Sequence, residues 1–173
     1  MPTVPLYPQD EGGVTIRVPG GVPVYLPQYR IYVWVRIGSE YAPRQAVLDT
    51  GAASCIFSQA VWEAFDDRNW IEWASHPPGA DPNEVLPKTT ILSGTYPFRL
   101  SIVTVQVVEF NGDAKLAPVR VLVQCTEDKP VLPTDPKPLP RLLLVGLHGI
   151  LNGRTLTVSA SPDGKDWAAS LTQ

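Results

Sequence analysis

Residues 47–54 read VLDTGAAS, and this short stretch combines side chains that can do chemistry. Asp49 supplies a carboxylate, which can take up or release a proton. Thr50 supplies a hydroxyl, and Gly51 lets the backbone approach other groups closely because it has no Cβ atom. The Asp-Thr-Gly triplet occurs once in the chain. This single acid among small residues is therefore the first candidate for a catalytic group.

The residues on both sides of the triplet predict strands that would hold it in place. Residues 29–37 (YRIYVWVRI) are aromatic and β-branched, which favours a strand, and Gly38 ends it. Residues 44–48 lead into the triplet as a second strand, and residues 54–57 leave it as an apolar third one. Far downstream, residues 142–147 (LLLVGL) form another aliphatic run that ends near a glycine.

This combination resembles the retropepsins, the dimeric, retrovirus-type branch of the aspartic proteases. After their Asp-Thr-Gly loop, such chains have two or three aliphatic residues, a glycine, a short helix and a last strand, and residues 142–147 and 155–158 fit that order. The resemblance covers roughly residues 30–160. Because the chain is longer than the compact viral enzymes, it looks more like a cellular or bacterial member of the family.

The resemblance implies an all-β fold. We expect a single retropepsin-like acid-protease lobe, pseudo-symmetric and barrel-like, with one or two short helices. One domain would cover residues 1–173, with its core in residues 14–160 and proline-rich loops at residues 75–88 and 127–140. Nineteen prolines spread along the chain also argue against a helical bundle.

The resemblance also implies a mechanism that needs two copies of the chain. The two-lobed pepsins carry the motif twice, so an active enzyme built from this chain would be a homodimer in which Asp49 faces its symmetry mate. Two carboxylates at that distance share one proton. The ionised one takes a proton from a water molecule, and the protonated one polarises the scissile carbonyl. The implied activity is an aspartic endopeptidase acting on a peptide or protein substrate, with no cofactor and no metal.

The three residues after Asp49 would support this active-site loop. By the resemblance, Thr50 is buried and its hydroxyl joins the two loops of the dimer. Gly51 lets both loops crowd the acids, and its N–H can point at a carboxylate. Ala52 matches the retropepsins, whereas pepsin-like loops carry Ser or Thr at this position.

A flap is the second feature that the resemblance implies. Retropepsins close a glycine-tipped β-hairpin over the substrate, and residues 90–96 offer such a hairpin. Its candidate substrate-binding residues are Ser93, Gly94, Thr95 and Tyr96. An ordinary hairpin turn is the alternative interpretation of the same residues.

Two positions depart from the viral pattern and keep other functions open. Viral enzymes typically have an acidic residue after Asp-Thr-Gly-Ala and an Arg after the downstream glycine, and these two side chains pair. This chain has Ala53 and Leu147 there. One alternative is therefore a catalytically silent retropepsin-fold module for dimerisation or peptide binding. Another is a monomeric β-domain in which Asp-Thr-Gly is only a turn.

The rest of the chain predicts short strands, turns and one more helix. Asn-Gly between two alternating apolar runs is a strong hairpin signal. Residues 162–173 are polar and show no pattern. The further elements that we expect are a strand at residues 14–18, a short helix from Ser58 to Phe65, and strands at residues 101–110 and 118–125 around the turn at Asn111 and Gly112.

Composition excludes several other classes of function. A net charge of −3 gives no electrostatic case for binding nucleic acid or an anionic membrane, and no apolar run is long enough for a membrane-spanning helix. Cys55 and Cys125 are too few for a disulfide framework, and His76 and His148 lack the spacing of metal ligands. A nucleophilic Cys55–His148 pair is conceivable, but a thiol in an apolar strand is usually buried and inert. Because the N-terminus does not resemble a secretory signal, we expect a cytoplasmic protein.

Ala52 generates a prediction about pH dependence. A hydroxyl at this position would donate to the active carboxylate and favour its ionised form. Because Ala52 has no hydroxyl, we expect peptide hydrolysis to be fastest in mildly acidic rather than strongly acidic solution, and we expect Ala52→Ser to move the optimum to lower pH. A pH–rate profile of both purified dimers tests this. A marked rise of the optimum in the Ala52→Ser protein would contradict the prediction.

Overall fold

The described residues fold into a single sheet with very little helix. The computed structural model describes residues 1–17, 19–49, 51–64, 69–70, 86–91, 94–132, 134, 143–162 and 166–173. The all-β prediction is confirmed. The strands are β1 (Thr3–Ile16), β2 (Val24–Ile37), β3 (Arg44–Asp49), β4 (Cys55–Phe57), β5 (Asn69–Trp70), β6 (Lys88–Ile91), β7 (Gly94–Val108), β8 (Val119–Thr126), β9 (Leu143–Gly146), β10 (Thr155–Ala160) and β11 (Trp167–Thr172), and the helices are α1 (Gln59–Trp62) and α3 (Leu147–Ile150).

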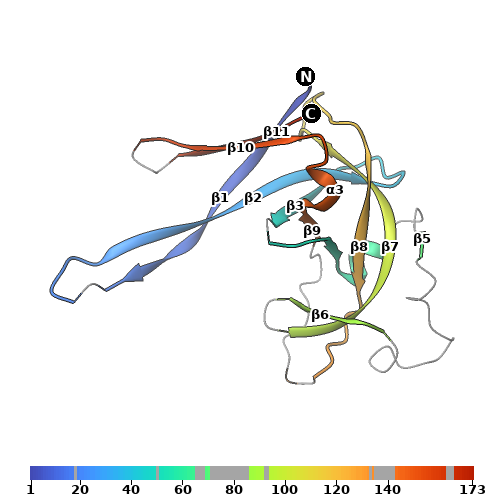
Figure 1. Ribbon diagram of the computed structural model, residues 1–173, viewed down its shortest axis with the longest axis horizontal. Helices are drawn as coiled ribbons and strands as arrows, with labels where there is room; N and C mark the ends of the chain where they lie inside the picture. The colour runs from blue at the N-terminus through green and yellow to red at the C-terminus, as the bar shows by residue number, and fades with distance from the viewer. Residues whose placement is uncertain are drawn as a thin grey trace.

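The described strands form one sheet of 11 strands in the order β10-β11-β1-β2-β3-β9-β4-β8-β7-β5, with β6 paired to β7 (Figure 1). An additional pairing of β2 with β7 joins the two limbs of this sheet. The strands β2, β3, β9, β4, β8 and β7 therefore make a closed ring of hydrogen-bonded neighbours. The sheet as a whole is not a simple barrel, because β1, β10 and β11 run off this ring.

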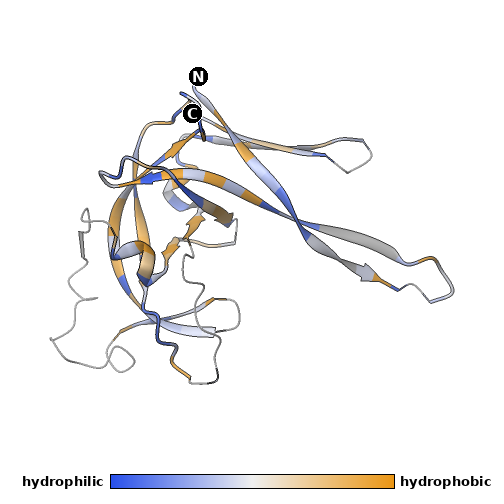
Figure 2. Ribbon diagram, turned by 180° about the vertical axis from the view of Figure 1, so that it is seen from behind, coloured by the Kyte–Doolittle hydropathy of each residue, from blue (hydrophilic) through white to orange (hydrophobic). Residues whose placement is uncertain are grey.

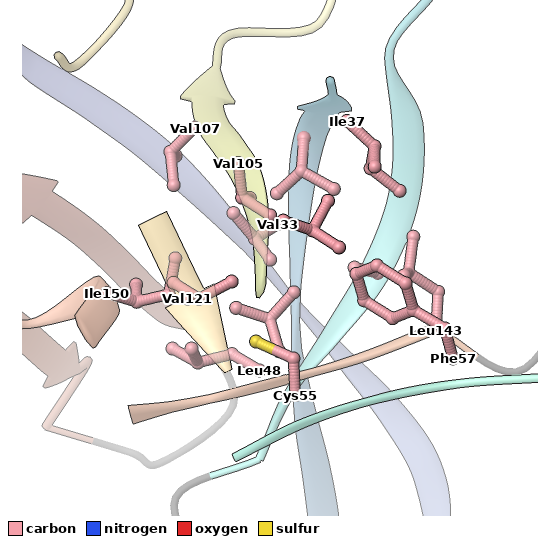
Figure 3. Close-up of a cluster of buried hydrophobic side chains, with 14 of the residues drawn as sticks. Val33, Ile37, Leu48, Cys55, Phe57, Val105, Val107, Val121, Leu143 and Ile150 are labelled. Atoms are coloured by element: carbon pink, nitrogen blue, oxygen red, sulfur yellow. The ribbon is translucent and has the colours of Figure 1, made fainter. Parts of the chain in front are cut away.

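The main core lies inside this ring (Figure 3). Side chains on a strand alternate between its two faces, so every second residue of the long strands points inward. Val33, Val35 and Ile37 of β2 follow this rule and are at most 1% exposed. The same alternation in β7 and β8 brings valines from strands far apart in sequence into contact. The core members labelled in Figure 3 are Val33, Ile37, Leu48, Cys55, Phe57, Val105, Val107, Val121, Leu143 and Ile150.

Most of the strands predicted from sequence are present, and several are longer than expected. The predicted strand at residues 14–18 is the far end of β1, which begins at Thr3. The second half of the flap hairpin and the strand at residues 101–110 are one continuous strand, β7. The Asn-Gly turn is confirmed, with Asn111 at a φ of 58° in the left-handed region. The helix after Ser58 is shorter than predicted, because it ends at Trp62.

Both ends of the chain contribute to the core beyond the expected range of about residues 14–160, because Val4, Leu6, Ala169 and Leu171 are also buried in it. Residues 162–173 show no pattern in the sequence, yet they contain β11, which pairs with both β1 and β10. The reason is non-local. The small residues of β11 carry a weak strand signal by themselves, and pairing with two neighbours fixes their extended conformation.

Some expected features lie outside the described residues. These are Thr50, Phe65, Ser93, His76, and most of the two proline-rich loops. Among the helices that are described, none has the length and apolar character needed to cross a lipid bilayer.

Candidate active-site loop

The predicted catalytic loop connects two strands that are separated by a third. β3 ends at Asp49 and β4 begins at Cys55, and β9 lies between them, parallel to β3 and antiparallel to β4. Asp49 is therefore the register partner of Gly146. The two sequence segments that carried the resemblance are neighbours in space. β9 therefore fills the space between the two ends of the loop, and its pairing with β3 fixes the position of Asp49.

Gly146 allows this insertion because the loop passes directly over it. A Cβ atom at this position would lie 2.4 Å from the carbonyl oxygen of Ser54 and 2.8 Å from that of Ala52. Both contacts are with backbone, which cannot move aside as the end of a flexible side chain can. Only glycine fits here. The glycine of the LLLVGL run is therefore required by the backbone of the Asp49 loop and not by the conformation of its own strand.

Asp49 is held by its own loop. The backbone N–H of Gly51 donates to Asp49 Oδ1 at 2.9 Å, and the N–H of Ala52 reaches the Asp49 carbonyl oxygen at 3.4 Å. The first bond agrees with the expected role of the Gly51 N–H. Within one chain, however, a Cβ atom at Gly51 would meet only Asp49 Oδ1, at an ordinary 3.5 Å. The described part of a single subunit therefore gives no steric reason for glycine at this exposed position.

Strand alternation shows which face of the sheet carries Asp49. Leu48 points into the main core, so the side chains of Val47 and Asp49 point to the other face. The register pairs Val47 with Leu144 of β9, and Leu144 with Ile56 of β4. Register partners lie on the same face of a sheet. Asp49 is thus half-buried on the face that also carries Leu144 and Ile56.

The predicted flap hairpin covers this same face. β6 and β7 pair antiparallel with Ile91 opposite Gly94, so the two strands of the hairpin are present. Ile91 and Tyr96 form a second apolar cluster with Ile56, and Leu144 packs against it. The hairpin therefore packs against β4 and β9, which lie beside the predicted catalytic loop. Figure 2 shows it at the lower end of the molecule, from which β7 continues into the main body of the sheet.

Tyr96 and Gly94 depend on each other within the flap. Tyr96 is 2% exposed, and its hydroxyl oxygen would lie 2.4 Å from a Cβ atom at Gly94. Gly94 is buried as well, at the first position of β7 and not in the turn. In this structure the buried Tyr96 is part of the packing of the hairpin, and the half-buried Thr95 is the described flap candidate with more solvent access.

The start of the proline-rich connection supports the flap from outside. The N–H of Val131 donates to the Thr95 carbonyl oxygen at 2.8 Å, and the N–H of Glu127 donates to that of Pro97 at 2.9 Å. The Glu127 carboxylate also pairs with Arg99 at 2.8 Å, with both side chains largely buried. Residues 127–131 thus lie beside β7, as the predicted surface connection requires, and attach the flap to the body of the protein.

A hydrogen bond that sequence reasoning missed holds the far end of the loop. Gln124 of β8 donates from Nε2 to Ser54 Oγ at 2.9 Å, and Ser54 is 8% exposed. Gln124 is the register partner of Ile56, so it lies on the Asp49 face. Its Oε1 is buried and has no hydrogen-bond partner among the described residues. The available signal was a polar residue at a position of β8 that alternates with the buried residues Val123 and Cys125.

Other chemistries find little support near the loop. Cys55 is fully buried, and burial raises the pKa of its thiol to about 11, so at neutral pH it is a protonated and unreactive core residue. This agrees with the expected inert thiol, while His148 is exposed on α3. Within the described ranges, no three His, Cys, Asp or Glu side chains gather in a way that could hold a metal ion.

An open groove of about 660 Å³ lies at the opposite end of β3. Its single charged lining residue, Arg44, donates from Nε to Glu40 at 2.9 Å. Arg44 and Asp49 are the two ends of β3, so about 16 Å of strand separates them. This groove is not part of the Asp49 site. Its lining residues are Trp34, Pro43, Arg44, Gln45, Ala60, Val61 and Leu143.

The loop geometry generates a prediction about two glycines. We expect Gly146→Ala to lower the free energy of unfolding by about 1–3 kcal/mol, because the added methyl group overlaps the loop backbone. The matched control is Gly51→Ala, which adds the same methyl group two residues from Asp49 without a close contact and should change stability by less than about 0.5 kcal/mol. Urea unfolding of the three proteins measures both. Equal stability of the two variants would contradict the packing of the loop over β9.

Comparison with known proteins adds no relative to this geometry. The chain matches no protein-family model, no curated protein and no solved structure. A functional conclusion therefore depends on the Asp49 loop, on the strands that hold it, and on the hairpin over the same face of the sheet.

Proposed function

We propose that this protein is an aspartic endopeptidase of retropepsin type, active as a homodimer. The observation that carries the proposal is the position of Asp49. Asp49 is the last residue of β3, and β9 is inserted between β3 and β4, the two strands that the Asp49 loop connects. Asp49 also lies on the face of the sheet that the flap hairpin covers. The aliphatic strand, the glycine and the next strand follow in the order that the family resemblance predicts, and the short segment α3 between them is only partly helical, because His148 and Gly149 have non-helical backbone angles.

The proposed reaction needs one Asp49 from each of two chains. The two carboxylates would lie close enough to share one proton. The ionised acid takes a proton from a water molecule between them, and that water attacks the carbonyl carbon of the peptide bond. The protonated acid donates its hydrogen bond to the carbonyl oxygen as charge develops there. The resulting gem-diol collapses when a proton is transferred to the leaving amine, and the dyad returns to its starting state.

The dimer would also account for Gly51. One chain has room for a methyl group at this exposed position, so the need for glycine would come from the second loop or from the substrate. The flap would hold an extended peptide against the dyad, with Thr95 as its described residue that has solvent access. The half-buried Leu144 offers apolar surface of the kind that such peptide-binding clefts prefer, whereas Ile56 is covered by the hairpin.

The departures at Ala53 and Leu147 favour a second candidate function. Ala53 is exposed at the outer part of the loop and has no charge with which to anchor a substrate backbone. A silent module that keeps the fold and binds peptides or a second copy would tolerate this loss. Proteolysis remains our conclusion, because the loop keeps the acid, the adjacent glycine and the supporting flap together.

The deciding experiment compares the wild type with Asp49→Asn on a mixed peptide library. Asparagine keeps the size of the side chain but cannot exchange a proton, so we expect the cleavage rate to fall at least about 10²-fold. Unfolding by urea should be nearly unchanged, because Asp49 is half-buried and does not belong to the main core. Equal cleavage by both proteins, or none by either, would favour the silent module.

A mixing experiment tests the requirement for two chains. Unlabelled Asp49→Asn protein is added in increasing excess to a fixed amount of wild type, and the rate is followed after subunit exchange. Mixed dimers hold only one acid, so we expect the activity to fall toward zero as the excess grows. The control is an equal amount of an unrelated protein of the same size. Activity that does not change with the excess would show that a single chain suffices and would contradict the dyad.

A further inference from the structure

Two β-ribbons extend from the body of the protein (Figure 1). The longer one is formed by β1 and β2, which pair from Tyr7–Tyr32 out to Ile16–Val24. β2 pairs with a further strand only from Ile31 onward, and β1 pairs with β11 only over residues 3–6. The shorter ribbon is formed by β10 and β11. Among the described residues, the outer part of the β1–β2 ribbon has no strand on either side.

These ribbons expose apolar side chains and carry few charges. Residues 12–28 contain a single charged residue, Arg17, and β10 contains none. Val22, in the turn of the longer ribbon, is 82% exposed, and Ile16 is 47% exposed. On the shorter ribbon, Val158 and Trp167 are 42% and 40% exposed. A long strand edge with little charge invites association, and natural proteins normally cover such edges.

The direction of the longer ribbon is fixed by specific contacts near its base. The register shifts between Asp10 and Gly13, which makes a bulge, and Asp10 Oδ1 accepts a hydrogen bond from the Gly12 N–H at 2.8 Å. Bulges bend a ribbon and set its direction. The Tyr32 hydroxyl donates to the Glu11 carboxylate, and the hydrogen bond and the nearby charge of Glu11 raise the pKa of Tyr32.

A ring contact joins the two ribbons. Tyr29 of β2 and Trp167 of β11 have ring centroids 5.0 Å apart. The ribbons therefore leave the body as one connected unit. A two-stranded ribbon that has no apolar partner is only marginally stable in water. The bulge and the ring contact set the direction of the β1–β2 ribbon. The outer part of the ribbon still lacks a surface to pack against among the described residues.

The ribbons project on the side where the candidate catalytic loop opens. In Figure 1, β3, whose last residue is Asp49, runs toward the side from which the ribbons extend. The turn between β2 and β3, residues 38–43, lies at the opposite end of the sheet. A second copy whose Asp49 faces the first would therefore stand on the side occupied by the ribbons.

We infer that the two ribbons clasp a second copy of this chain and make the dimer that the proposed protease needs. The inference rests on the proposed function for the identity of the partner, because one chain supplies half of the dyad. The exposed apolar side chains of the ribbons would lie against the partner subunit, and these are Ile16, Val22, Val158 and Trp167. By the twofold symmetry, each subunit would both give its ribbons and receive those of the other.

The area available is sufficient for a stable dimer. Residues 7–16 extend about 30 Å at about 3.3 Å per residue, and a two-stranded ribbon is about 10 Å wide, which gives a face of about 300 Å². The β10–β11 ribbon adds about 200 Å² in the same way. Because each chain gives and receives, about 1,000 Å² would be buried per subunit. Stable interfaces bury about 800 Å² per partner.

The test measures the dissociation constant of the dimer by analytical ultracentrifugation. All proteins carry Asp49→Asn, which removes self-cleavage and keeps the assay independent of activity. One variant replaces residues 11–28 with Asn-Gly, which makes a short turn between Asp10 and Tyr29. The other carries Ile16→Glu and Val22→Glu. The matched control is Tyr41→Glu, which changes a 92% exposed side chain in the β2–β3 turn.

We expect the double-glutamate variant to weaken the dimer at least about 100-fold, because charges would be buried against the partner. The shortened variant should be monomeric, and Tyr41→Glu should match the wild-type value. Urea unfolding of the shortened variant confirms that its body is folded. A dimer of unchanged affinity in both ribbon variants would overturn the inference, and so would an Asp49→Asn parent protein that stays monomeric at the highest attainable concentration.

These outcomes are separate from those of the proposed function. Asp49-dependent cleavage is measured with the proteins that retain Asp49. If the dimer persists without the ribbons and peptides are still cleaved, the clasp is wrong and the protease stands. If the ribbons control the dimer but no Asp49-dependent cleavage is found, the protease is wrong and the clasp stands as part of a non-catalytic dimer.

Discussion

The insertion of β9 between β3 and β4 is the constraint on which the rest of this structure depends. The loop that carries Asp49 must leave β3, pass over the end of β9 and enter β4. This path is sterically possible because position 146 is a glycine, since a methyl group there would lie within 2.4 Å of loop backbone. The insertion also fixes the register in which Asp49 ends its strand. A rigid sheet thus determines where the acid stands.

The two faces of these strands have different roles. One face fills the main core with Leu48, Cys55 and Val145, and it provides the stability of the domain. The other face carries Asp49 and Leu144, and it is covered by a smaller apolar cluster under the flap hairpin. The flap is therefore anchored at its base and supported from outside by Glu127 and Val131. This division lets the loop that carries Asp49 lie exposed at the edge of a well-packed sheet.

Catalysis and assembly are coupled in the proposed enzyme. One chain holds one acid, so the chemistry of the pair would exist only in the dimer, and the surfaces that control association would also control activity. The ribbons of β1–β2 and β10–β11 contribute little to the main core beyond their bases. Their length and apolar character are explained if they act on another subunit. An interface outside the cleft would also leave the loop residues free to serve the substrate.

Local sequence patterns predicted much of the architecture. Aromatic and β-branched residues identified β2, alternation of apolar residues identified β7 and β8, and Asn111-Gly112 identified the turn after β7. The DTG triplet was expected to follow the end of a strand, and β3 does end at Asp49. The LLLVGL run was expected to be extended, and it contains β9. The apolar surroundings of Cys55 were enough to predict a buried thiol. These features depend on neighbours in sequence. A two-residue period of apolar side chains is therefore enough to predict a strand, and an Asn-Gly pair is enough to predict a turn.

Tertiary structure alone decided the rest, because long-range pairing leaves no local signal. The weak pattern of β11 becomes a strand only through its pairing with β1 and β10, which also extends the core to Val4 and Leu171. The bond from Gln124 to Ser54 joins positions that are distant in the chain. The steric need for glycine at position 146 arises from a loop far away in sequence. The sequence by itself determined which residues could be reactive and which would be extended, whereas the order of the strands determined where the acid stands and which face covers it.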